Sequence, residues 1–106
     1  MQKVLIIEDH ADMRELLSWQ LELMGFMPIL AKHGKEGIEK ALAEKPELIL
    51  MDIMMPGMDG WETCTQIKCD AVTADIPVIL LTGANDRDLT QHANAVGASA
   101  LLQKPC

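Results

Sequence analysis

Five residues with charged or hydroxyl side chains each stand directly after a short apolar segment of the chain. Glu8 and Asp9 follow the first such segment, Asp52 the third, Thr82 the fourth and Lys104 the fifth. If these segments are parallel strands, their carboxyl ends meet at one edge of a sheet, where open α/β folds bind ligands. We therefore expect three carboxylates, a hydroxyl and an ammonium group to gather at that edge.

Such a set of side chains suits phosphoryl chemistry assisted by a metal ion. Three neighbouring carboxylates repel one another unless a cation compensates their charge. Mg²⁺ is the natural candidate, because it prefers oxygen ligands and is commonly held by carboxylates together with phosphate oxygens. Lys104 and Thr82 can then contact other oxygens of a transferring phosphoryl group. Phosphoryl transfer also requires a nucleophile, and Asp52 is the candidate because it is the central carboxylate.

Each of these residues also has an ordinary structural explanation. Glu8 and Asp9 fit the favourable dipole at the start of a helix, and Asp52 alone fits the beginning of a turn. Thr82 and Lys104 are each compatible with a solvated loop position. For any one residue this explanation is at least as good as a functional one. All five falling at the ends of the expected strands by chance is a far rarer coincidence, so the set favours a functional site.

Two kinds of segment alternate along the chain and must position these residues. Five short apolar segments have the length and continuous hydrophobicity of strands buried on both faces: Val4–Ile7, Met27–Ala31, Leu48–Met51, Val78–Leu81 and Ala100–Gln103. Longer segments with apolar residues at helical spacing predict four helices: Ala11–Met24, Lys35–Ala43, Gly60–Cys69 and Asp86–Val96. The alternation predicts one α/β domain over residues 1–106, with helices on both faces of a parallel sheet.

The composition excludes several classes of function. A net charge of −7 without any cluster of Lys and Arg argues against a nucleic-acid surface, since phosphate contacts need concentrated positive charge. No apolar stretch is long enough to span a bilayer, and no signal peptide follows Met1. The cysteines Cys64, Cys69 and Cys106 form no CxxC pair, and an odd number gives no disulfide framework, which predicts reduced thiols in a cytoplasmic protein.

The segment Leu48–Gly60, LILMDIMMPGMDG, closely resembles the phosphoacceptor strand and loop of response-regulator receiver domains. The segments VLIIED at Val4–Asp9 and VILLTG at Val78–Gly83, and the pair Lys104–Pro105, are similar to the other motifs of that family, in the same order and at appropriate spacing. The resemblance covers essentially the whole chain. It implies a phosphoacceptor switch with a doubly wound, flavodoxin-like sheet of five parallel strands in the order 2-1-3-4-5.

Carried over by position, the resemblance implies a role for each matching residue. Asp52 accepts the phosphoryl group, Thr82 is the switch hydroxyl that moves toward it, and Lys104 binds the phosphate. The implied Mg²⁺ ligands are Glu8, Asp9, Asp52 and the backbone carbonyl of Met54. The implied partners are a histidine kinase or phosphotransfer protein and an output domain or effector. Such a domain is an enzyme only in catalysing its own phosphorylation and dephosphorylation.

The chain departs from the family pattern in two ways. Leu101 stands where receivers usually carry the Tyr or Phe that turns inward on phosphorylation, and Leu has no ring for this aromatic readout. The family also continues into a fifth helix, whereas this chain stops at Cys106. We expect either that the domain is truncated before its last helix, or that it forms a homodimer through the sheet face that this helix would cover.

Two other functions remain open from the residues alone. An aspartate-nucleophile phosphohydrolase also uses a strand-end Asp with Mg²⁺, but it needs a second Asp two residues later, and here that residue is Met54. A pure interaction module would keep the fold and take no phosphate; the intact set of five polar residues argues against it. His10, next to the acidic pair, fits an ordinary surface histidine better than a metal ligand or a phosphohistidine.

Overall fold

The computed structural model describes residues 2–52, 60–82 and 100–103 of the chain. The described strands are β1 (Lys3–Ile7), β2 (Met27–Ala31), β3 (Leu48–Asp52), β4 (Val78–Thr82) and β5 (Ala100–Gln103). The described helices are α1 (Ala11–Leu23), α2 (Gly34–Glu44) and α3 (Gly60–Cys69). The helix predicted over Asp86–Val96 lies outside the described residues.

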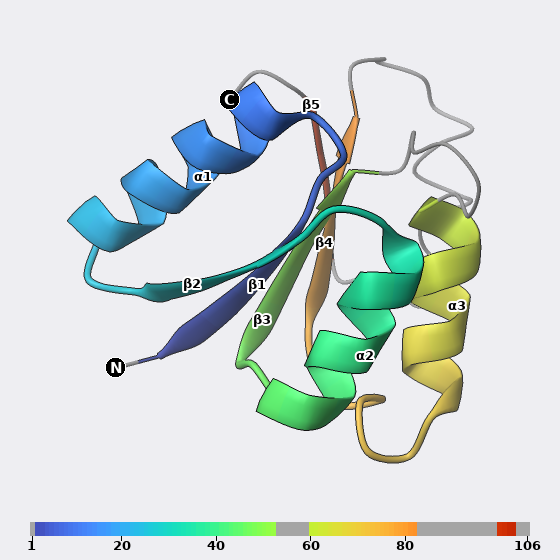
Figure 1. The fold of residues 1–106 in the computed structure, drawn as a ribbon. Coiled ribbons are helices and arrows are strands. Elements are labelled where there is room, and N and C mark those ends of the chain that lie inside the picture. The colour runs from blue at the N-terminus through green and yellow to red at the C-terminus, as the bar shows by residue number, and fades with distance from the viewer. Residues whose placement is uncertain (1, 53–59, 83–99, 104–106) are drawn as a thin grey trace.

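All strand pairs in the sheet are parallel, in the order β2-β1-β3-β4-β5 (Figure 1). β1 lies between β2 and β3, and Ile7 pairs with Ala31 on one side and with Met51 on the other. The continuous apolar sequences of β1 and β3 suit a central position in the sheet, because helices cover both faces of a central strand. The predicted α/β class with a parallel sheet is confirmed.

The larger hydrophobic core lies between the sheet and the helices α2 and α3, which cover the same face (Figure 1). Its fully buried members come from β1, β2, β3 and β4 and from both helices, and they include Leu5, Ile7, Met51, Ala41 and Cys64. Burial raises the pKa of the Cys64 thiol, which keeps it protonated and apolar. The predicted reduced state agrees with free Cys64 and Cys69 in the structure, whereas Cys106 lies outside the described residues.

A smaller core lies on the opposite face, under α1. Val4 and Ile6 of β1 contact Leu21 of the helix, and the half-buried Leu48 and Leu50 of β3 pack at the margin of this cluster. Among the described helices, α1 alone covers this face (Figure 1). Within the same described ranges, no helix combines the length and the apolar character that crossing a membrane requires.

Both ends of α2 follow from local chemistry. The ring nitrogen Nδ1 of His33 accepts a hydrogen bond from the backbone N–H of Glu36, and the Glu36 carboxylate accepts one from the N–H of Lys32. This reciprocal arrangement resembles a capping box and starts the helix at Gly34. The helix ends at Glu44, and the C-cap residue Lys45 adopts the left-handed conformation with φ of 49°.

Candidate functional site

The register of the central strands brings Glu8 and Asp52 to the same edge of the sheet. β1 and β3 are adjacent and parallel, and Ile7 pairs with Met51, so the residues that follow these two lie side by side. Glu8 is 0% exposed and Asp52 is 2% exposed. Two carboxylates are therefore held almost out of solvent at neighbouring strand ends, where the sequence predicted them.

The loop that carries Glu8 and Asp9 is tied to the elements around it. The Glu8 N–H donates to the carbonyl of Ala31 at 3.1 Å, which fixes the end of β1 to the end of β2. Arg14 of α1 donates from Nη1 to the carbonyl of Glu8 at 2.8 Å and to that of Asp9 at 3.4 Å. One guanidinium thus donates to two successive backbone carbonyls near the helix start.

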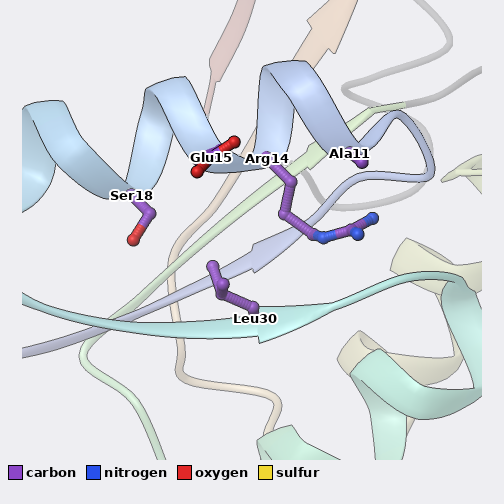
Figure 2. Close-up of a pocket in the computed structure, with 5 residues that line it drawn as sticks. All are labelled: Ala11, Arg14, Glu15, Ser18 and Leu30. Atoms are coloured by element: carbon purple, nitrogen blue, oxygen red, sulfur yellow. The ribbon is translucent and has the colours of Figure 1, made fainter.

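Arg14 also lines a groove of about 300 Å³ between α1 and β2, together with Ala11, Glu15, Ser18 and Leu30 (Figure 2). The groove shares none of its lining residues with the group of carboxylates. We therefore assign Arg14 a positioning role toward the loop and assign no ligand to the groove.

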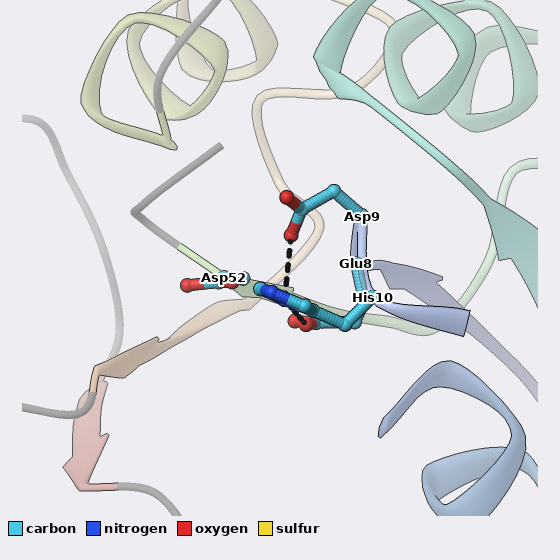
Figure 3. Close-up of side chains that lie close together, drawn as sticks. All are labelled: Glu8, Asp9, His10 and Asp52. Atoms are coloured by element: carbon cyan, nitrogen blue, oxygen red, sulfur yellow. Dashed lines mark hydrogen bonds and ion pairs between the residues drawn. The ribbon is translucent and has the colours of Figure 1, made fainter. Parts of the chain in front are cut away.

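The structure gathers four potential metal ligands at this edge (Figure 3). Glu8, Asp9, His10 and Asp52 each offer one ligand atom, and these atoms all lie within 4.8 Å of one another. Three of the four were predicted from the sequence. The fourth, His10, had been assigned to an ordinary surface position.

The His10 ring lies between the two acidic side chains that precede Ala11 in the chain. Its Nδ1 atom is 3.2 Å from Oε1 of Glu8 and 3.1 Å from Oδ1 of Asp9 (Figure 3). The side chain remains 71% exposed, so little packing fixes the ring. The signal in the sequence was its position directly after the acidic pair, but that position alone does not tell which way the ring turns.

The donor set fits a divalent cation on its own chemistry. Oδ1 of Asp9 is buried and has no hydrogen-bond partner among the described residues, because its approach to His10 lacks hydrogen-bond geometry. A buried carboxylate oxygen without such a partner is costly unless a cation or water satisfies it. Together with the nearby oxygens of Glu8 and Asp52, it offers the hard oxygen ligands that Mg²⁺ prefers.

The other predicted site residues fall partly or wholly outside the described residues. Thr82 ends β4, and its backbone pairs with Gln103 of β5 at the same edge of the sheet as Asp52. The side chain of Thr82, the carbonyl of Met54 and the whole of Lys104 lie outside what the structure describes. Their roles therefore remain predictions.

Comparison with known proteins gives one consistent answer. The family model of the response regulator receiver domain matches residues 4–106. Protein PilH of Pseudomonas aeruginosa is 35% identical over 105 residues, which cover 99% of this chain and 87% of PilH. The phosphate regulon transcriptional regulatory protein PhoB of the same organism is 35% identical over 102 residues, which cover 96% of this chain but 44% of PhoB. The chain thus spans less than half the length of several curated relatives that it matches.

Solved structures agree with the sequence comparisons. The chemotaxis protein CheY4 of Vibrio cholerae superposes with a TM-score of 0.96 at 30% identity, covering 100% of this chain and 88% of that one. The N-terminal domain of a response regulator receiver protein from Methanoculleus marisnigri gives a TM-score of 0.91 at 35% identity, covering 99% of this chain and 85% of that one. The fold is thus the flavodoxin-like receiver fold. The chain belongs to the family of response regulator receiver domains of two-component signalling.

Proposed function

We propose that the chain is a Mg²⁺-dependent phosphoacceptor switch that takes a phosphoryl group on Asp52 from a histidine kinase, a phosphotransfer protein or a small phosphodonor. The observation that carries the proposal is the Asp52 carboxylate, almost fully buried, with ligand atoms of Glu8 and Asp9 within 4.8 Å. A buried carboxylate in such company needs compensating positive charge, which a metal ion and a phosphate-binding lysine supply together.

The transfer is a single displacement at phosphorus. A carboxylate oxygen of Asp52 forms a bond to phosphorus while the bond from phosphorus to the donor breaks, and the bonding electrons leave with the donor. The donor atom is a histidine nitrogen in a kinase and the acetate oxygen in acetyl phosphate. The product is an acyl phosphate on Asp52, with more negative charge at the edge of the sheet than the carboxylate alone carried.

The surrounding residues hold the transferred group and oppose its charge. Glu8, Asp9, Asp52 and the carbonyl of Met54 are the residues that would hold Mg²⁺, which would supply positive charge beside the phosphoryl oxygens. Lys104 pairs with a phosphoryl oxygen.

Thr82 donates a hydrogen bond from its hydroxyl to the third phosphoryl oxygen and moves toward it. That movement shifts the population of surface conformations presented to an output domain or effector. The domain is thus a switch that turns over no substrate beyond its own phosphoryl group.

We infer the same architecture and cellular setting for this domain as for a soluble receiver of the family. The sheet is the doubly wound, five-stranded arrangement of the family, the domain works in the cytoplasm, and it contacts neither nucleic acid nor membrane. The net charge of −7 supports the absence of a nucleic-acid surface on this domain. Any DNA-binding or catalytic output belongs to a partner or an attached domain.

The decisive experiment is the intact mass of the protein after incubation with acetyl phosphate, with and without Mg²⁺. We expect a single phosphate adduct in wild type that requires Mg²⁺ and is absent in Asp52→Ala and Asp52→Asn. Asn retains the size of the side chain, so far-UV circular dichroism of that variant separates loss of the nucleophile from loss of the fold. Asp75→Asn, an exposed carboxylate in the α3–β4 connection, is the matched control that keeps the adduct.

The other outcomes distinguish the remaining functions. An adduct that survives in Asp52→Asn would contradict the assignment of the nucleophile. No adduct in folded wild type would favour an interaction module that takes no phosphate. Steady turnover of a generic phosphate ester would favour the phosphohydrolase.

A further inference from the structure

His10 lies inside the ligand set of the site, although it does not belong to the carboxylate pattern that predicted the site. Its nearest ring nitrogen, Nδ1, is almost equally far from Oε1 of Glu8 and Oδ1 of Asp9, at 3.2 and 3.1 Å. Any cation that those two oxygens share therefore meets the imidazole as well. The ring must either turn away or become a ligand.

The spacing of the four atoms favours a ligand. Two donor atoms held about 2.1 Å from the same ion lie about 3 Å apart when they are neighbours and about 4 Å apart when they are opposite. The distances from Nδ1 to the two oxygens match neighbouring ligands. The whole set, within 4.8 Å, needs only a small contraction to surround one ion.

We propose that His10 is a direct ligand of the divalent cation and shifts the preference of the site from Mg²⁺ toward first-row transition ions such as Mn²⁺. Resting on the proposed function, the inference concerns the metal at the same phosphoacceptor site. His10 would add an imidazole nitrogen to a set of metal ligands that are otherwise oxygen atoms.

The chemistry of the ligands sets the direction of this preference. Mg²⁺ is bound through carboxylate, carbonyl and water oxygens, whereas imidazole nitrogen suits transition ions, with affinities that rise from Mn²⁺ to Cu²⁺. Mn²⁺ accepts both kinds of ligand. A site with three carboxylates and one imidazole therefore gains affinity for Mn²⁺ from the nitrogen and gains little for Mg²⁺.

The exposure of His10 supports the assignment. In the structure Nδ1 donates a hydrogen bond to Oε1 of Glu8 at 3.2 Å, so a cation bound at this nitrogen would take the place of the Nδ1 proton, which is released to solvent. At 71% exposed, the ring is not held by packing and is free to make that exchange. A simple ion pair with the acidic side chains is the alternative role. That role predicts the opposite response, because a ring bound to Glu8 and Asp9 competes with every cation alike, and removing it would strengthen Mg²⁺ and Mn²⁺ binding together.

The test measures metal binding directly and needs no phosphoryl transfer. Mn²⁺ is titrated into the protein and the free ion is followed by electron paramagnetic resonance, with Mg²⁺ affinity taken from displacement of Mn²⁺. Electron spin-echo modulation of bound Mn²⁺ then reports whether a nitrogen nucleus is a ligand. The variants are His10→Ala and, as the matched control, His33→Asn, which replaces another exposed loop histidine by a residue that also caps helices.

We expect nitrogen modulation in wild type and His33→Asn, and none in His10→Ala. We also expect the Mn²⁺ affinity of His10→Ala to fall by about tenfold or more, the range seen for disrupted metal sites, with a much smaller change for Mg²⁺. The inference is overturned if wild type shows no nitrogen modulation, if the modulation persists in His10→Ala, or if His10→Ala binds both ions more tightly.

A separate result identifies failure of the underlying site. If Mn²⁺ binding is undetectable in wild type, or is unchanged by Asp52→Asn, the metal site itself is misplaced and the inference about His10 falls with it. The Mg²⁺-dependent mass adduct on Asp52 tests the proposed function independently, so the two failures can be told apart.

Discussion

Arg14 shows how a residue that touches no reacting atom can set the geometry of the site. Its guanidinium donates to the carbonyls of Glu8 and Asp9, so it holds the loop that aims both acidic side chains. Residues that orient metal ligands commonly change metal affinity by about 10- to 100-fold when they are removed. The acidic pair therefore depends on α1 for its position.

We expect Arg14→Met to weaken Mg²⁺ binding by about tenfold and to slow adduct formation at limiting Mg²⁺, while saturating Mg²⁺ restores most of the rate. Met retains much of the aliphatic bulk and removes the donors. The measurement is the rate of phosphate adduct formation against Mg²⁺ concentration, with Glu15→Gln as the control from the same groove. Equal Mg²⁺ dependence in Arg14→Met and wild type would show that the loop holds its shape without the guanidinium.

The start of α2 is an element whose stability depends on pH. The backbone N–H of Lys32, which donates to the Glu36 carboxylate, holds the pKa of this carboxyl below its ordinary value of 4.5. Because the folded pKa lies below the unfolded one, the stabilisation is fully present above the unfolded pKa. It is lost as the pH falls through the folded pKa.

We therefore expect Glu36→Gln to lower the urea midpoint at pH 7, and this difference from wild type to shrink as the pH falls below about 4.5. Gln cannot ionise, so the variant lacks this part of the acid dependence. The measurement is the urea midpoint between pH 3 and pH 7, with the exposed Glu39→Gln on the same helix as control. A difference that stays constant across this range would contradict the pH dependence assigned to Glu36.

The contact between α2 and the sheet requires the absence of a side chain at Gly37. A Cβ atom there would lie 2.7 Å from Cγ1 of Ile7 and would also meet its Cδ1. Ile7 is 0% exposed, so its side chain cannot avoid the contact by turning into solvent. The glycine sets how closely the helix lies on β1.

We expect Gly37→Ala to destabilise the domain, since overpacking costs about 1–3 kcal/mol and outweighs the gain of about 1 kcal/mol in helix propensity. Ile7→Val removes Cδ1 and alone costs about 0.5–1.5 kcal/mol. In the double variant the two costs should be less than additive by about 1 kcal/mol, as measured by urea unfolding. Strict additivity would mean that the helix moves as a body and that the contact is not specific.

Across the whole molecule, the sequence predicted what depends on repeating patterns and missed what depends on a single backbone turn. Apolar segments placed Glu8 and Asp52 at neighbouring strand ends, because parallel strands share an edge. The direction of the His10 ring depends on the turn after β1, which no periodicity encodes. α2 begins one residue earlier than predicted because His33, an unusual N-cap residue, accepts the capping hydrogen bond.

The sheet face beside α1 bears on how the whole molecule associates. Leu48, Leu50 and Ile79 are half-buried there, although they belong to central strands. Apolar side chains on a central strand normally lie beneath a covering element, and a contiguous apolar patch left open tends to associate. The half-buried side chains fit both alternatives drawn from the sequence, a domain truncated before its last helix and a homodimer through this face, so the homodimer stays a prediction.

We expect sedimentation velocity over a dilution series to show a dimer that dissociates at low concentration, and Leu50→Thr to weaken it by reducing the apolar surface. Thr is compatible with a strand and adds no charge, so the fold should persist, as thermal unfolding can verify. The matched control is Val72→Thr, an exposed apolar residue in the α3–β4 connection, which should leave association unchanged. A monomer at every concentration would contradict the dimer. Equal effects of Leu50→Thr and Val72→Thr would place the contact elsewhere, because a dimer formed through this face must lose apolar contact specifically when Leu50 is shortened.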